Sequence, residues 1–341
     1  NFLMKNFFKG KHGPLLIAEI GGNHEGNFEY ALKLTQLAIE SDVDVIKYQL
    51  YSGSTLVNKK ESPERHSHFK KFELSKEQHI KLANICIENK VQYSASVWDL
   101  SRFDWIDAFL KFYKVGSGDL TAYSLLESIA KIGKPIVLST GLSDLSEITD
   151  TVNFLKLRNS IYELENYLSI LQCTSLYPNK EEDVNLNVIH TLKNKFNYPI
   201  GYSDHTTGTL ALKTAYTMGA DILEFHFTDN REDKTFRDHH ISLTQSEVLN
   251  LIKSIKEVDI LKGNSKKVLL PNEISSDHIT SFRRAIYARK FIKLGAKIKR
   301  EDLISLRPNH GIDAREISNL IGKTAMEDIE ELSVLSYKMF R

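Results

Sequence analysis

The sequence has 341 residues, of which 41% are hydrophobic and 26% charged, which is enough for one large domain and a small one. Lys and Arg total 45 against 44 Asp and Glu, and the formal net charge of +1 argues against nucleic acid or an anionic membrane as the main partner. Cys86 and Cys173 form no CxxC motif, residues 1–10 do not resemble a signal peptide, and no apolar run approaches the roughly 20 residues of a membrane helix. We therefore expect a cytoplasmic protein with reduced thiols.

Apolar runs alternate with segments of helical spacing from residue 15 to residue 261. The expected strands are 15–21, 44–50, 92–98, 112–117, 135–140, 167–174, 199–205 and 222–228. The expected helices are 28–41, 77–90, 103–110, 123–132, 147–157, 186–195, 210–218 and 244–261. This strict alternation predicts an α/β fold, a (β/α)₈ TIM barrel. A doubly wound sheet is the alternative, but no GxGxxG motif follows the first strand.

Two other parts of the chain lack this alternation. Residues 56–72 are polar, basic and contain histidines, and we expect them to form a long loop. After Lys262 the pattern changes to a linker-like stretch and then to short strands and turns, typical of a small β-rich module. We expect a barrel domain at 1–262, a linker at 263–281 and a β-rich domain at 282–341.

Two neighbouring expected strands each end in a histidine, His205 after Ser-Asp and His226 after Glu-Phe. Parallel barrel strands place their carboxyl ends, and usually their chemistry, at one face. Neutral imidazoles on adjacent strands form a half-site for a divalent metal, with positions left for oxygen ligands. The structural alternative is that one histidine bonds a buried carbonyl and the other caps a loop.

Polar residues also follow the other expected strands. They include Glu19, Asn23, His24, Glu25, Lys47, Gln49, Ser96, Lys114, Ser117, Ser139, Thr140, Thr174, Ser175, Tyr177, Ser203 and Glu224. Lys47 and Lys114 interrupt apolar strands, where a charge is costly unless it is paired or used. With the hydroxyls and the glycine turns at 116–118 and 139–141, they predict a site for a small, highly charged anion. Internal ion pairs with Glu19 or Glu224, and ordinary strand-to-helix turns, are the alternatives.

Motifs along the whole chain occur in a combination that is highly specific. They are IAEIGGNHEG, DVIKYQ, YKVGSGD, IVLSTG, LQCTSLYP, GYSDHTTG and LEFHFT, followed in the tail by SLRPNHGI and LIGKTA. Together they resemble the sialic acid (nonulosonate) synthase family, and the tail resembles its C-terminal SAF, or antifreeze-like, domain. The resemblance implies condensation of phosphoenolpyruvate with an N-acetylmannosamine-type sugar to a nine-carbon 2-keto acid and phosphate. It also implies a divalent metal, Mn²⁺ or Mg²⁺, and a domain-swapped homodimer.

Carried over position by position, the resemblance also implies roles for single residues. Glu19, His205 and His226 would form the catalytic set, with both histidines as metal ligands and Glu19 handling the water that adds to C2. The phosphoenolpyruvate contacts would be Lys47, Ser96, Lys114, Ser117, Ser139, Tyr177 and Ser203. Asp238 would bind sugar hydroxyls, and Arg307 would reach the sugar site of the partner subunit.

The chain departs from the family pattern mainly on the sugar side. Thr-Phe-Arg at 235–237 stands where the family has Gly-Pro before Asp238, neutral Phe225 replaces a basic residue, and the loop 59–71 has no clear match. The acceptor is therefore left open between N-acetylmannosamine and the 2,4-diacetamido-trideoxyhexose of a legionaminate or pseudaminate synthase. A DAHP- or KDO-8-phosphate-type enzyme is disfavoured because no second arginine-rich phosphate site is evident. A non-catalytic sugar-binding barrel is disfavoured by the intact histidines and lysines.

Overall fold

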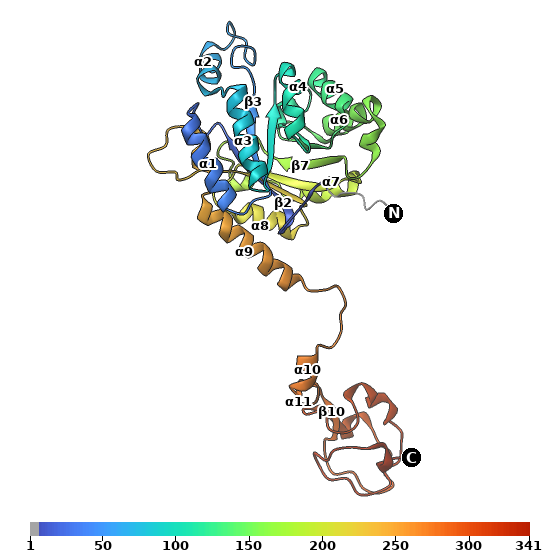
Figure 1. Ribbon diagram of the computed structural model, residues 1–341. Coiled ribbons are helices and arrows are strands. Elements are labelled where there is room, and N and C mark those ends of the chain that lie inside the picture. Colours follow the sequence, from blue (N-terminus) through green and yellow to red (C-terminus); the bar gives the residue numbers. More distant parts are fainter. Residues whose placement is uncertain (1–6) are drawn as a thin grey trace. The chain divides into compact units, whose positions relative to one another are not determined.

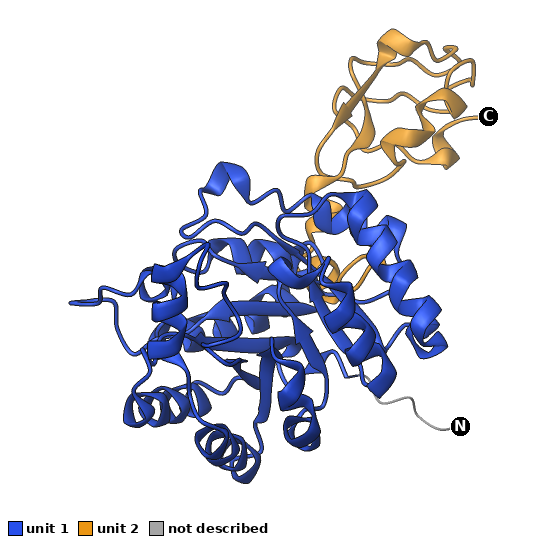
Figure 2. Ribbon diagram, turned by 90° about the horizontal axis from the view of Figure 1, so that it is seen from above, with its two compact units in different colours: residues 1–263 blue, residues 264–341 orange. Residues whose placement is uncertain are grey.

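The computed structural model describes residues 7–341. Residues 1–6, which include part of the stretch compared with a signal peptide and the start of the expected barrel domain, lie outside the described residues. The chain divides into two compact units, unit 1 ending at Gly263 and unit 2 comprising Asn264–Arg341 (Figure 2).

Unit 1 contains a closed barrel of eight parallel strands. They are β2 (Gly13–Gly21), β3 (Val45–Leu50), β4 (Gln92–Val97), β5 (Tyr113–Val115), β6 (Ile136–Ser139), β7 (Leu168–Cys173), β8 (Ile200–Asp204) and β9 (Ile222–His226). The strands pair in chain order, and β2 also pairs with β9, which closes the barrel. A short strand, β1 (Lys9–Gly10), pairs antiparallel with the start of β2. The predicted TIM barrel is confirmed.

In the described chain, eight helices follow the barrel strands one by one (Figure 1). They are α1 (Phe28–Glu40), α3 (Lys76–Glu88), α4 (Phe103–Ile106), α5 (Tyr123–Ile132), α6 (Leu145–Arg158), α7 (Val188–Lys195), α8 (Leu210–Thr217) and α9 (Gln245–Lys262). Asn27, Ser75 and Asp144 start α1, α3 and α6 by accepting a backbone hydrogen bond in the first turn. The helix expected at 103–110 is shorter, because α4 passes into a 3₁₀ turn after Ile106.

The prediction of a long loop at 56–72 is wrong for its second half. Residues Pro63–Phe72 form the helix α2, with Pro63 in its first turn and two lysines in its last turn, as a helix favours at those ends. Only His66 and Phe72 of this helix are buried, so the sequence lacks the apolar repeat by which helices are recognised. Its sequence therefore resembles a polar loop.

Unit 2 has its own small core, built around residues such as Ile286, Leu303 and Leu320. Its strands β10 (Ala285–Ala288) and β11 (Leu303–Leu306) form an antiparallel pair. The stretch expected as a linker contains two short helices, α10 (Pro271–Ser275) and α11 (His278–Phe282).

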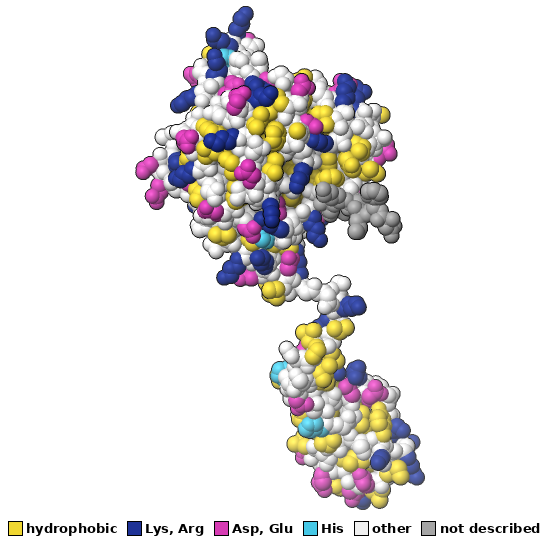
Figure 3. Space-filling model, in the orientation of Figure 1, with side chains coloured by type: hydrophobic (Ala, Val, Ile, Leu, Met, Phe, Trp, Pro, Cys, Tyr) yellow, Lys and Arg dark blue, Asp and Glu magenta, His cyan; other side chains and the backbone are white. Residues whose placement is uncertain are grey.

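Charged side chains of both signs are interspersed over the face of unit 1 that Figure 3 displays, as the near-zero net charge suggests. A membrane-crossing helix is not found among the described residues.

Candidate active site

The carboxyl ends of the barrel strands surround a cavity of about 1020 Å³. Every barrel residue to which the family resemblance assigns a role lines this cavity: Glu19, Lys47, Ser96, Lys114, Ser117, Ser139, Tyr177, Ser203, His205, His226 and Asp238. Asn23, His24, Glu25, Thr140 and Thr174, also noted at strand ends, do not line it. Arg307 belongs to unit 2, where its guanidinium lies 5.8 Å from the centroid of the Phe282 ring. One face of one barrel thus holds residues that are spread over more than two hundred positions of the sequence.

The two-residue repeat of the strands explains how these side chains reach the cavity. Successive strand residues point to opposite faces, so a side chain shares its face with the residue two positions earlier. Inside the barrel, a buried apolar cluster contains Leu15, Ile17, Val45, Phe112, Val137, Leu171 and Ile222. Two positions after five of these residues come Glu19, Lys47, Lys114, Ser139 and Glu224. The barrel interior therefore changes from apolar to charged along its axis.

The floor of the cavity is a cluster of two lysines and two glutamates. Lys47 Nζ lies 2.7 Å from Glu19 Oε2 and 3.9 Å from Glu224 Oε2, and Lys114 Nζ lies 3.5 Å from Glu224 Oε1. All four side chains are buried. The ion pairs considered from the sequence as an alternative are therefore present, and the same lysines line the cavity. Removal of one partner would leave an uncompensated buried charge.

The ionisation of these four groups is shifted by burial and by their neighbours. Burial raises the pKa of Glu19 and lowers the pKa of Lys114. Burial alone would raise the pKa of Glu224, but the ammonium groups of Lys114 and Lys47 outweigh it and lower this pKa to about 2. Glu224 is thus a fixed anion, whereas the raised pKa makes Glu19 the stronger proton acceptor of the two carboxylates.

Hydroxyl groups surround the same cluster. Lys114 Nζ donates to Ser139 Oγ at 2.7 Å, and Lys47 Nζ donates to Ser96 Oγ at 3.3 Å. Ser203 Oγ donates to Glu224 Oε1 at 2.9 Å. Both lysines and Glu224 therefore have a hydroxyl neighbour, and such a set of donors suits phosphate and carboxylate oxygens.

His205 and His226 lie side by side at the edge of the floor, with ring centroids 5.4 Å apart. His205 Nδ1 lies 2.8 Å from the Thr174 carbonyl oxygen. When Nδ1 carries the proton that is donated to this carbonyl, the other ring nitrogen, Nε2, is unprotonated and has a free electron pair. His226 Nδ1 is buried and lacks a hydrogen-bond partner among residues 7–341. Burial lowers the pKa of His226 to about 4, so its ring is neutral near pH 7.

This pair fits a divalent cation. Both imidazoles face one cavity, and the buried Nδ1 of His226 makes no hydrogen bond within the described chain. Groups of three or more His, Cys, Asp or Glu side chains arranged around a metal position are not found in the part of the chain that the structure describes. The protein would thus supply two ligands, and waters or substrate oxygens would complete the coordination.

Asp238 lies beside the histidines, 3.9 Å from His226 Nδ1 through its Oδ2 atom. Its other oxygen, Oδ1, accepts from Arg237 Nε at 2.9 Å, and Arg237 Nη2 lies 2.8 Å from the same oxygen. The Arg237 guanidinium also lies 4.1 Å from the centroid of the Tyr177 ring. Arg237 thus engages one oxygen of Asp238, and the oxygen nearer the histidines stays free of the guanidinium.

Residues 34–267 match the NeuB family, and residues 283–341 match the SAF domain. The chain belongs to the NeuB family. It is 36% identical to the N,N'-diacetyllegionaminic acid synthase of Legionella pneumophila, over 90% of this chain and 89% of that protein. It is 32% identical to the N-acetylneuraminate-9-phosphate synthase of Homo sapiens, over 94% of this chain and 91% of that protein. The crystal structure of an N-acetylneuraminic acid (sialic acid) synthetase from Leptospira borgpetersenii matches with a TM-score of 0.70 at 29% identity, over 77% of this chain and 89% of that chain.

Membership of the NeuB family confirms the family resemblance seen in the sequence, including the SAF domain of the tail.

Sequence reasoning in this NeuB-family chain missed one side of the cavity. The residues concerned are Arg65, His68, Phe69 and Phe72 of α2, together with Phe236 before Asp238. They come from the segment expected to be a loop and from the segment that departs from the family pattern. The clustering of His and Phe within 66–72 could have indicated the α2 residues, and the departure at 235–237 could have indicated Phe236.

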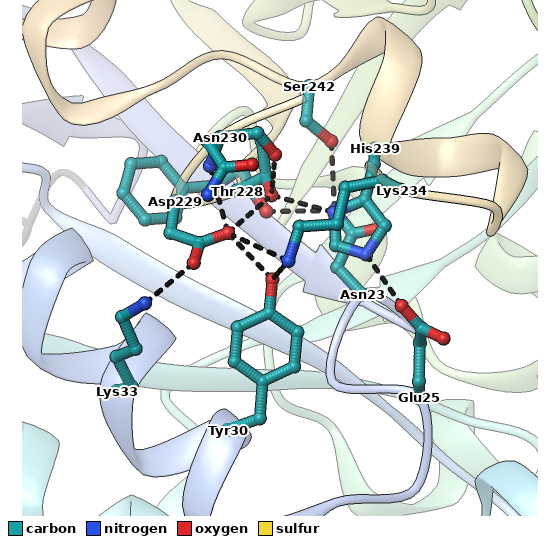
Figure 4. Close-up of polar contacts among 11 residues, drawn as sticks. Asn23, Glu25, Tyr30, Lys33, Thr228, Asp229, Asn230, Lys234, His239 and Ser242 are labelled. Carbon is teal, nitrogen blue, oxygen red and sulfur yellow. Dashed lines mark hydrogen bonds and ion pairs between the residues drawn. The ribbon is translucent and has the colours of Figure 1, made fainter. Parts of the chain in front are cut away.

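A buried polar network holds the segment that carries Asp238 in place (Figure 4). Asn23 Nδ2 donates to Ser242 Oγ at 2.8 Å, and Ser242 Oγ donates to the Asp238 carbonyl oxygen at 2.6 Å. His239 Nε2 lies 3.1 Å from Glu25 Oε1. The Asn-His-Glu stretch after β2 thus anchors the backbone around Asp238.

Proposed function

We propose that this chain condenses phosphoenolpyruvate with an N-acetylated amino sugar, forming a 2-keto sugar acid and releasing phosphate. The observation that carries the proposal is the buried cluster of Lys47, Lys114, Glu19 and Glu224 beside a histidine pair, at the catalytic face of a NeuB-family barrel. The names of the Legionella and human relatives, synthases of sialic acid-type products, support it.

In this proposal the floor binds phosphoenolpyruvate. Lys47 and Lys114 would neutralise its phosphate and carboxylate, and the hydroxyls of Ser96, Ser117, Ser139 and Ser203 would add donors, with Tyr177 beside them. Both lysines are already paired with glutamates, so the bound anion would share these cations. Fixing phosphoenolpyruvate at the floor would hold its C3 carbon within reach of a sugar aldehyde at the histidines.

Glu19 is the proposed base. Once C3 of phosphoenolpyruvate has bonded to the aldehyde carbon, the positive charge left at C2 is trapped by water, and phosphate then leaves from C2. The raised pKa of Glu19 suits acceptance of the proton of that water at Oε2. Among residues 7–341, this oxygen has an ion-pair partner in Lys47 but no group in hydrogen-bond geometry.

The histidine pair is the proposed metal site. His205 and His226 would hold a divalent cation, Mn²⁺ or Mg²⁺, which when bound polarises the aldehyde oxygen as a Lewis acid. Asp238 would orient the sugar through its hydroxyls, using the oxygen that Arg237 leaves free.

We further propose a domain-swapped homodimer in which Arg307 of one subunit completes the sugar site of the other. A guanidinium offers several donors in a fixed plane and suits an acetamido carbonyl or a sugar hydroxyl. The match of residues 283–341 to the SAF domain supports this role for the tail.

Phosphate release from phosphoenolpyruvate, measured with N-acetylated hexosamines and with phosphorylated aldoses, tests the proposed reaction. We expect release that depends on an N-acetylated acceptor, and a 2-keto acid product confirmed by mass spectrometry. Preference for a phosphorylated pentose or tetrose would instead identify an enzyme of the DAHP or KDO-8-phosphate kind. Binding without release, for every acceptor and with Mn²⁺ or Mg²⁺ present, would indicate a non-catalytic barrel.

A further inference from the structure

Helix α2 packs backbone to backbone against the loop that follows β3. A Cβ atom added at Gly53 would lie 2.5 Å from the N and Cα atoms of Lys70 and 2.7 Å from the carbonyl carbon of Phe69. Carbon atoms that are not bonded to each other normally approach to about 3.5–4.0 Å. The three atoms belong to the backbone of α2, so no side-chain rotation can relieve the overlap. Position 53 therefore requires a residue without a Cβ atom as long as α2 keeps its place.

A second glycine contacts the end of α2 from the turn that follows β2. A Cβ atom at Gly26 would overlap the carbonyl oxygen of Lys71 and would lie 3.4 Å from Cα of Phe72. Gly26 also has a φ of +78°, a conformation that favours glycine by itself. The last turn of α2 is thus held at two backbone contacts, one after β2 and one after β3.

A carboxylate fastens the same end of the helix. Glu73 is the first residue after α2, and its Oε2 atom accepts from the backbone N–H of Gly53 at 2.9 Å. Its other oxygen, Oε1, accepts from Arg102 Nη2 at 3.3 Å. Glu73 therefore ties the end of α2 to the glycine that makes room for the helix and to the segment that follows β4.

These contacts fix the place of a helix that lines the outer side of the cavity. The lining residues of α2 are Arg65, His68, Phe69 and Phe72. Only His66 and Phe72 of the helix are buried, so core packing gives it a small anchor. Phe72 also contacts Phe236, with ring centroids 5.0 Å apart. A displacement of α2 would therefore shift the outer lining and reach the segment before Asp238.

We propose that Gly26 and Gly53 are positioning residues of this enzyme, which set the distance between α2 and the barrel and thereby the binding of the acceptor sugar. The inference rests on the proposed condensation and adds to it the means by which the outer side of the cavity is held. Neither glycine lines the cavity, so both would act through α2. The floor residues belong to strands that bond to one another, and a shift of α2 would leave them in place.

Gly53→Ala tests the proposal, because the φ of Gly53 lies outside the left-handed region and the added methyl group acts through contact alone. With the N-acetylated hexosamine that gives the fastest phosphate release, we expect the KM for the acceptor to rise by about ten- to hundredfold, the scale of a misplacement of about 1 Å. The KM for phosphoenolpyruvate is expected to stay within about twofold. Amide hydrogen exchange should become faster in α2 and stay unchanged in the barrel strands.

Gly10→Ala is the matched control. A Cβ atom there would overlap the Pro14 carbonyl oxygen, where β1 pairs with the start of β2, at the opposite end of the barrel. This variant is expected to lower the unfolding temperature while both KM values stay within about twofold. A rise in the acceptor KM equal to that of Gly53→Ala would show that any overlap of this size disturbs the site, and would overturn the inference.

Two substitutions of Glu73 test the same helix position without adding a methyl group. Glu73→Ala is expected to raise the acceptor KM severalfold, and Glu73→Gln, which keeps an oxygen for the N–H of Gly53, is expected to recover part of the loss. Wild-type acceptor KM in Gly53→Ala would overturn the inference, as would equal KM values in wild type, Glu73→Ala and Glu73→Gln if Gly53→Ala does not fold. Absence of phosphate release from the wild type with every N-acetylated acceptor would instead contradict the proposed function itself.

Discussion

The floor and the outer side of the cavity are built in opposite ways. The floor, formed by Glu19, Lys47, Lys114 and Glu224, consists of buried charged groups on the barrel strands β2, β3, β5 and β9, with the two histidines at its edge. The outer side, formed by His68, Phe72, Phe236 and Arg237, comes from α2 and from the segment after β9, and all of these side chains except Phe72 are at least partly exposed.

In the proposed reaction, this difference would separate the groups that react from those that select the acceptor. Hydrogen-bonded neighbouring strands fix the distances between charges, and burial makes their interactions strong. The segments of the outer side are not part of the sheet, so residues there can change without disturbing the charges below. Substitutions at the floor are therefore expected to affect the reaction with every acceptor, and substitutions on the outer side to affect the choice among acceptors.

The largest effect is expected at the histidine pair. Removal of divalent metal by a chelator should abolish turnover, and Mn²⁺ or Mg²⁺ should restore it. His205→Ala should lose turnover to a similar degree while the unfolding midpoint changes little, because a side chain at a strand end adds little to the core. Steady-state phosphate release and thermal unfolding measure the two effects. Full activity in a metal-stripped sample would show that the proposed reaction does not require a metal.

Arg307 tests whether the cavity of unit 1 is complete by itself. If Arg307 completes the partner's sugar site, then Arg307→Ala and His205→Ala should each be nearly inactive alone. Mixed and reassembled, they should regain up to about a quarter of wild-type activity, since random pairing makes half of the dimers mixed and each mixed dimer has one intact site. Absence of recovery despite demonstrated subunit exchange would show that the tail serves its own barrel or none.

A lysine substitution tests the binding of phosphoenolpyruvate at the floor independently of the metal. Lys114→Met keeps much of the side-chain volume but removes the ammonium group that contacts Glu224 and Ser139. We expect phosphoenolpyruvate binding to weaken by about 2–5 kcal/mol, the usual cost of truncating a buried charge pair. Lys253→Met, at an exposed lysine on α9, is the control. If calorimetry shows the same affinity for phosphoenolpyruvate in Lys114→Met and in Lys47→Met as in the wild type, both lysines have a purely structural role.

The floor could be predicted from the sequence because the same repeat governs burial and direction. An apolar strand residue such as Val45 identifies the inward face, and Lys47, two positions later, must share it. The ion pairs of the two lysines were harder to predict from the sequence, because they depend on which strands are neighbours in the closed barrel. The sequence left it open as an alternative, and the structure settles it with Glu19 and Glu224.

The outer side could not be predicted in this way. Helix α2 buries only two of its ten residues, so no periodicity distinguishes it from a loop. The contact between His68 and Phe236 joins segments about 170 positions apart through ring stacking, which leaves no pattern in a single sequence. Even Arg237, noted as a departure from the family, gave no sign of its contact with the Tyr177 ring.

The smallest effect is expected at Arg237, which stands between the two regions. Its side chain is 58% exposed, so its ion pair with Asp238 is largely screened and contributes at most about 1 kcal/mol. Arg237→Ala should therefore raise the KM for the acceptor severalfold, since Asp238 loses the partner that fixes one of its oxygens, while the KM for phosphoenolpyruvate stays constant. Arg237→Lys should recover only part of this loss, because an ammonium group cannot present the planar set of donors with which a guanidinium bonds Asp238 while it contacts the Tyr177 ring. Initial-rate kinetics with each substrate varied in turn separate the two constants. A matching rise in the KM for phosphoenolpyruvate would mean that Arg237 acts on the floor as well, and that the two regions are coupled rather than separate.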